Sequence, residues 1–202
     1  MFILKSMTTT PGFKSNNSKW RPIILLIVIM IASDAVGQTY IKGNAMSTLL
    51  GLPGIGIEKG IGEYATIQFD VMGSPWRSIQ NKPKQFVVAI FEYRHHFKAK
   101  FNGFYVGANM GGTAFNIQKW NYINSDQYQK GFGFVVGATI GYQAPINEKF
   151  VLDCFVGGGS HQGFYKGYYI STGERYDGAK NYNKSGEWFP YRAGVMVSYK
   201  LF

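Results

Sequence analysis

Apolar residues alternate with small or polar residues through most of the chain after residue 38, and this alternation constrains the fold more than any other feature. Successive side chains of a β-strand point to opposite faces, so a period of two predicts strands. In residues 132–142 one face holds Phe132, Phe134, Val136, Ala138, Ile140 and Tyr142. No segment after residue 38 carries the apolar stripe of an amphipathic helix, so we expect an all-β protein.

The composition agrees with strands. The 202 residues include 26 Gly, 16 Phe, 14 Tyr and 4 Trp, whereas Gly usage in proteins averages about 7%. Each interior Gly destabilises a helix by about 1 kcal/mol relative to Ala, so this bias excludes most helical domains. A single cysteine, Cys154, excludes a disulfide framework and a cysteine-based zinc site.

The first residues have the features of a secretory signal peptide. Basic residues precede an apolar run at residues 23–32, which is shorter than the roughly 20 residues that a transmembrane helix needs. We expect cleavage after Gly37, so that residues 1–37 are the signal peptide and residues 38–202 form the mature domain. An uncleaved amphipathic anchor is the alternative.

Charge narrows the range of partners. The mature chain would carry 17 basic and 10 acidic residues. An exported basic protein meets the polyanionic lipids and glycans of the cell surface, and we expect no nucleic-acid partner.

The second face of the predicted strands separates a membrane barrel from a soluble sandwich. In a sandwich that face is solvated and rich in charged residues, whereas here it is dense in Gly with isolated charges. The apolar face has aromatic residues at both ends, as in strands that face lipid. The last strand shows the same pattern, with Phe189, Tyr191, Ala193, Val195, Val197, Tyr199 and Leu201 expected to point outward.

We therefore predict an eight-stranded, antiparallel, up-and-down transmembrane β-barrel. Short connections on one side and long ones on the other would place both termini on the periplasmic side of a bacterial outer membrane. The connection at Leu52-Pro53 is expected to be a tight turn. The predicted strands are Ile41–Leu50, Gly54–Gly60, Tyr64–Gly73, Lys84–Phe97, Gly103–Ile117, Gly131–Ala144, Phe150–Phe164 and Phe189–Phe202.

Several short motifs resemble one family over about Ile41–Phe202. They are Lys42-Gly43-Asn44, the Gly-Ile-Glu-Lys-Gly-Ile-Gly stretch from Gly56 to Gly62, Ser74-Pro75-Trp76, Phe91-Glu92-Tyr93-Arg94, Phe101 to Gly107, Gly141-Tyr142-Gln143 and Tyr199-Lys200-Leu201-Phe202. In order and spacing the chain is similar to small outer-membrane β-barrels of unknown function that are common in Bacteroidetes-type bacteria. The resemblance implies the barrel fold and supplies no catalytic residues.

Charged residues within the predicted strands are expected to face the lumen, because a charge at the midplane of a bilayer costs several kcal/mol. We interpret them as ion pairs that replace an apolar core in a narrow barrel. A path for protons or small ions is the alternative. His96, His161 and Lys200 lie nearby in phase. The predicted lumen residues are Glu58, Asp70, Glu92, Arg94, Asp153 and Arg192.

The longest predicted loop, Tyr165 to Trp188, combines tyrosines with cations. That composition suits glycans, lipid-headgroup phosphates or a protein partner, and it also suits an aromatic girdle with ordinary solvated charges. The candidate surface-binding residues are Lys166, Tyr168, Tyr169, Arg175, Tyr176, Lys180, Tyr182 and Lys184.

These features favour a non-enzymatic outer-membrane barrel with a structural or surface-interaction role, and not a wide pore. Expected partners are outer-membrane lipids, the barrel-assembly machinery and an envelope protein or glycan, with no cofactor and no metal. A narrow ion-conducting barrel is one alternative, and an outer-leaflet lipid-modifying enzyme is another. Ser160 and His161 would suit an enzyme, but adjacent strand residues point to opposite faces.

Overall fold

The computed structural model describes residues 37–77, 82–119, 122, 124–178 and 181–202. The predicted signal peptide lies outside these residues except for Gly37. The chain divides into two units, and the second, Gly37–Phe202, is the one described below. Within it, no helix has the length and apolar character needed to cross a bilayer.

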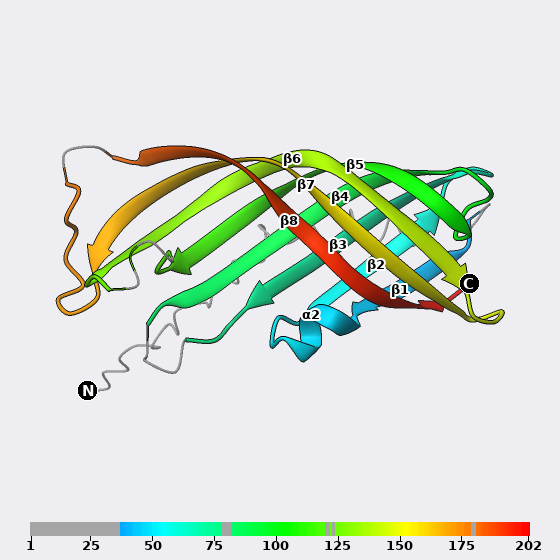
Figure 1. The fold of residues 1–202 in the computed structure, drawn as a ribbon, viewed down its shortest axis with the longest axis horizontal. Coiled ribbons are helices and arrows are strands. Elements are labelled where there is room, and N and C mark those ends of the chain that lie inside the picture. The colour runs from blue at the N-terminus through cyan, green and yellow to red at the C-terminus, as the bar shows by residue number, and fades with distance from the viewer. Residues whose placement is uncertain (1–36, 78–81, 120–121, 123, 179–180) are drawn as a thin grey trace, which may run out of the picture. The chain divides into compact units, whose positions relative to one another are not determined.

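The described residues of this unit form eight strands and one short helix (Figure 1). They are β1 (Thr39–Asn44), α2 (Ala45–Leu49), β2 (Gly54–Gly60), β3 (Ala65–Ser74), β4 (Lys84–His96), β5 (Gly103–Ile117), β6 (Gln127–Pro145), β7 (Phe150–Tyr169) and β8 (Asn183–Lys200). Each strand pairs antiparallel with the next. The prediction of an all-β fold with eight antiparallel up-and-down strands is confirmed.

The first and last strands also pair, so the strand order closes into a ring. This closing contact is short: five residues of β1, Tyr40–Asn44, lie opposite Met196–Lys200. Among the described residues, the part of β8 before Met196 pairs with β7 alone.

The two ends of the barrel differ in their connections. The short-turn end carries residues 61–64, 97–102 and 146–149. Thr39 lies there beside Phe202, whose carbonyl oxygen accepts a hydrogen bond from the Thr39 amide at 3.3 Å. The opposite end, called the loop end, carries the described residues of the connections 45–53, 75–83, 118–126 and 170–182. We call the halves nearest to them the short-turn half and the loop half.

The first predicted strand is wrong beyond Asn44, and Leu52-Pro53 is not a tight turn between strands. Residues 45–49 form helix α2, because the Asn44 side chain accepts a hydrogen bond from the Ser47 amide at 3.0 Å and caps the helix. The first connection therefore spans residues 45–53, so long and short connections alternate throughout.

The distribution of polarity is the reverse of that in a soluble protein. Of the buried side chains that the structure describes, eight are apolar and 18 are polar or charged, so most of the described interior is polar. The outward face of β6 is exposed and apolar as predicted, from Phe132 at 44% exposure to Tyr142 at 43%. Cys154 is exposed on the same outer wall, opposite Tyr142.

A β-bulge changes the phase of β8. Gly157 lies opposite Arg192 but Gly159 lies opposite Phe189, so β8 has one extra residue there. The prediction that Phe189 and Tyr191 point outward is therefore wrong. The Phe189 ring contacts His161 at 5.9 Å between centroids, and Tyr191 donates a short hydrogen bond to the buried Asn109.

Candidate functional site

All six predicted lumen residues lie inside the barrel, and hydrogen bonds join them into one network. The network also contains a cation that the sequence analysis did not assign to the lumen, Lys42 of β1. Its Nζ lies 2.6 Å from Glu58 Oε2 and 2.8 Å from Gln68 Oε1, and it also donates to Asp153 Oδ2. These four side chains are buried and come from β1, β2, β3 and β7. The ammonium of Lys42 therefore bridges distant strands.

Arg94 of β4 forms the centre of the network. Its Nε donates to Glu92 Oε2 at 2.7 Å, and its Nη1 donates to Asp153 Oδ2 at 2.8 Å and to Glu58 Oε2 at 3.2 Å. The guanidinium carbon lies 4.5 Å from the centre of the Tyr105 ring. The Tyr105 hydroxyl in turn donates to Asp153 Oδ1 at 2.9 Å. One guanidinium thus holds three carboxylates.

Arg192 of β8 extends the network toward the middle of the barrel. Its two terminal nitrogens donate to the two Asp70 oxygens at 2.9 and 2.7 Å, a bidentate pair. Its Nη2 also donates to Glu92 Oε2 at 2.9 Å. Glu92 therefore connects Arg94 to Arg192, and the charges form a continuous chain across the lumen.

The network contains three cations and four carboxylates, and its core is filled by the side chains themselves. Among the described residues Glu92 Oε1, Arg94 Nη2 and Arg192 Nε have no hydrogen-bond partner. His96 borders the network, with Nε2 3.2 Å from Thr66 Oγ1. Removing one member of a buried ion pair leaves an uncompensated charge. The hydrogen bonds of Lys42, Arg94 and Arg192 thus link the buried carboxylates into a plug that fills the lumen where a soluble protein would have an apolar core.

The other predicted neighbours lie elsewhere. His161 is in the loop half, where its Nε2 is 3.0 Å from Thr113 Oγ1, and Lys200 ends β8 at the short-turn end. Ser160 lies opposite the exposed Trp188, whereas His161 lies opposite Glu187. The serine and the histidine therefore occupy opposite faces.

The lumen of the loop half holds a cavity of about 300 Å³. Its walls are mostly apolar, and include Val88, Phe115, Val135 and Phe189. At its rim Lys119 Nζ pairs with Glu187 Oε1 at 2.6 Å, and both side chains are partly exposed. This is the size of a small ligand pocket, which spans about 300–1,000 Å³.

The predicted surface-binding loop is shorter than expected, because β7 continues to Tyr169 and β8 begins at Asn183. Strand residues include Lys166, Tyr168, Tyr169 and Lys184, whereas Arg175, Tyr176 and Tyr182 lie in the connection. Lys180 lies outside the described residues. The prediction of one loop cluster is therefore corrected.

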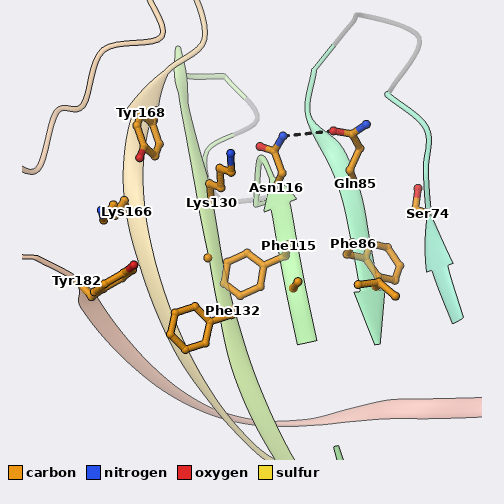
Figure 2. A pocket seen from close by; sticks show the side chains of 13 residues that line it. Ser74, Gln85, Phe86, Phe115, Asn116, Lys130, Phe132, Lys166, Tyr168 and Tyr182 are labelled. Carbon is orange, nitrogen blue, oxygen red and sulfur yellow. Dashed lines mark hydrogen bonds between the residues drawn. The ribbon is translucent and has the colours of Figure 1, made fainter. Parts of the chain in front are cut away.

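The structure brings four of these residues together on the outer wall: Lys166, Tyr168, Tyr182 and Lys184. A groove of about 540 Å³ is lined by three of the four, together with Lys130, Phe132 and Asn116. Figure 2 shows Asn116, Lys130, Phe132, Lys166 and Tyr168 projecting from neighbouring strands, with Tyr182 beside them. Lys184 lies next to the groove, with Nζ 5.9 Å from the centre of the Phe164 ring.

Tyr169, Tyr176 and Arg175 belong to a separate group. The rings of Tyr169 and Tyr176 are 5.5 Å apart, and Arg175 Nε donates to Asp177 Oδ1 at 2.7 Å. Burial opposes ionisation of Asp177, but hydrogen bonds from Arg175 and from the Gly167 amide outweigh it, and they hold the pKa of the carboxyl below its usual value. This group stabilises the connection itself.

Within the described ranges, no group of three or more His, Cys, Asp or Glu side chains could hold a metal ion. Comparison with known families matches residues 22–201 to a family described as "Protein of unknown function (DUF3575)". The match covers most of the chain, so the chain belongs to this family. No curated protein matches the chain.

Proposed function

We propose that this member of the DUF3575 family is an integral outer-membrane β-barrel protein. In this proposal residues 1–37 direct export and are cleaved, and both ends of the mature chain lie on the periplasmic side. The observation that carries the proposal is the reversed polarity: charged side chains fill the short-turn half of the interior, and large apolar side chains cover the outer wall. Paired strands satisfy one another's backbone groups within lipid, and here the ring of strands is complete where Tyr40–Asn44 pair with Met196–Lys200.

The role that this geometry supports best is a structural or surface-interaction one. The plug around Arg94 fills the short-turn half with paired side chains, which argues against a narrow ion-conducting barrel. The opposite orientation of Ser160 and His161 argues against a lipid-modifying hydrolase. The loop end, with its cations and tyrosines, is the part available to an envelope protein or glycan.

Location and fold can be tested together. The protein should fractionate with outer membranes, should need detergent for extraction and should give a strand-dominated circular dichroism spectrum. It should also migrate differently on gels before and after heating, and mass spectrometry of the mature chain should find Gln38 at its start. Release by osmotic shock without detergent, or a helical spectrum, would contradict the proposal.

The interaction role needs a separate experiment. Cross-linked complexes are recovered from intact membranes for the wild type and for a variant with Gln at Lys166, Arg175, Lys180 and Lys184. A partner captured by the wild type and lost from the variant supports surface interaction. Identical recovery from an equally abundant variant would leave only the structural role.

A further inference from the structure

The outer wall of the loop half has a sharp boundary between a polar row and an apolar row. The strand register places Gln85, Asn116, Lys130 and Lys166 opposite one another across β4–β7. Two residues closer to the short-turn end, the register places another row across the same four strands: Val87, Ala114, Phe132 and Phe164. The rings of Phe132 and Phe164 stack at 5.5 Å. Cations thus lie immediately beside a continuous apolar surface.

The two lysines of the polar row face each other without an acidic partner. Lys130 and Lys166 are direct cross-strand neighbours, and like charges in that arrangement destabilise a sheet. No ion pair among the described residues includes Lys130, Lys166 or Lys184. Lys166 Nζ instead lies 4.8 Å from the centre of the Tyr182 ring. An anion between the lysines would remove their repulsion.

The outer wall has a groove beside Lys130 and Lys166. The groove of about 540 Å³ is bordered by the rings of Phe132, Tyr168 and Tyr182. In Figure 2 Lys130, Lys166 and Asn116 come from three adjacent strands around it. Asn116 Nδ2 donates to Gln85 Oε1 at 3.2 Å, which fixes the polar edge of the groove.

We propose that this groove binds a phosphate-bearing lipid of the surrounding membrane. The phosphate lies between Lys130 and Lys166, and the acyl chains lie along Phe132 and Phe164. An amphiphile fits this arrangement because, across β4–β7, one row supplies cations and amides and the next supplies apolar surface. The inference rests on the proposed membrane location, since the apolar row would face water in a soluble protein.

The test uses the full mature protein in phosphatidylcholine nanodiscs that are titrated with phosphatidic acid, with retained lipid measured by native mass spectrometry. The double variant Lys130→Gln/Lys166→Gln should bind phosphatidic acid roughly 30-fold more weakly, from the usual contribution of two basic residues near an anionic lipid surface. The matched control is Lys98→Gln/Lys149→Gln, which removes the same charge from exposed positions at the short-turn end. Control and wild type should bind alike.

A second variant separates a lipid from a free phosphate. Phe132→Ser keeps both lysines but interrupts the apolar row, so it should weaken binding of phosphatidic acid. Inorganic phosphate at equal concentration should not displace the lipid from the wild type. Displacement by inorganic phosphate, an unaffected Phe132→Ser variant, or equal loss in the control pair would each overturn the proposal. Failure of the wild type to enter nanodiscs would overturn the membrane location instead, so the two failures are distinguishable.

Discussion

In the short-turn half, three cations and four carboxylates fill the lumen, whereas in the loop half mostly apolar side chains line a cavity of about 300 Å³. The wall differs as well: β1 pairs with β8 only at Met196–Lys200, at the short-turn end. The polar interior therefore lies where the ring of strands is complete. Substitutions in the charged core should destabilise the protein strongly, because each charged side chain is shared among several partners. Substitutions around the apolar cavity of the loop half should have smaller effects.

Arg94→Met should produce the largest effect. The substitution leaves the three carboxylates that share this guanidinium without their central cation, and breaking such buried pairs costs about 3–5 kcal/mol. Unfolding by denaturant in detergent micelles, followed by circular dichroism, measures the loss. Lys119→Met is the matched control in the loop half, since its ion pair is partly exposed and such pairs contribute about 0–1 kcal/mol. Equal destabilisation by both variants would remove the contrast between the halves.

Gly107→Ala should have an intermediate effect. A Cβ at this position would lie 2.6 Å from Glu92 Oε1, and Glu92 cannot turn away freely because two arginines hold its other oxygen. Overpacking of this kind costs about 1–3 kcal/mol. Gly43→Ala is the control, because no atom lies within 4 Å of its added Cβ. If Gly107→Ala unfolds at the same denaturant concentration as the control, the core is less rigid than its contacts imply.

A smaller effect is expected from acid on the connection 170–182. The pKa of Asp177 is lowered in the folded state, so its stabilising contribution is present above the ordinary carboxyl pKa of about 3.9 and is lost as pH falls through the lower folded value. Amide exchange near Gly167 and Asp177, corrected for intrinsic rates, should stay constant down to about pH 4 and then rise. Asp177→Asn should show the faster exchange already at neutral pH. An unchanged profile in that variant would mean that other contacts hold the connection.

The smallest expected effect concerns the ion conductance of the barrel. The plug in the short-turn half should leave no continuous water path, so the wild type should give no stable conductance steps in planar bilayers. The cavity of the loop half does not by itself conduct ions, because a water path through the barrel must cross both halves. Reproducible steps that disappear on Glu92→Gln or Arg94→Gln would support an ion path.

Much of the inner surface could be predicted from the sequence. Period two leaves each strand residue only two orientations, and the cost of a charge in lipid favours the inward one. The sequence therefore predicts an inward orientation for Glu58, Asp70 and Arg192, and all three side chains are buried. The same argument applies to Lys42, a charged residue in the first predicted strand. A lysine near the end of a predicted strand also suits solvent, so the sequence alone leaves the orientation of Lys42 open.

The bulge in β8 and helix α2 were not predicted. Both interrupt the two-residue alternation of side-chain orientation without a change in composition that would mark them in the sequence. The bulge in β8 adds one residue and reverses the orientation of Phe189 and Tyr191. Its one sequence signal is Pro190, since proline within sheets concentrates at edges and bulges. Helix α2 continues an alternating stretch, and only the capping side chain of Asn44 marks where the strand stops.

The short contact between β1 and β8 also has a kinetic consequence. Tyr40 and Lys200 lie near the two ends of residues 38–202, so this pairing closes a very long loop, and such non-local contacts form slowly. Lys42 is part of β1, and Asp153, 111 residues away, is part of β7. Their contact therefore depends on the pairing of β1 with β8, which brings β1 close to β7. Until then Glu58 and Asp153 have Arg94 as their shared counterion. We therefore expect β1 to pair with β8 late in folding, and Lys42 to reach Asp153 in the same step.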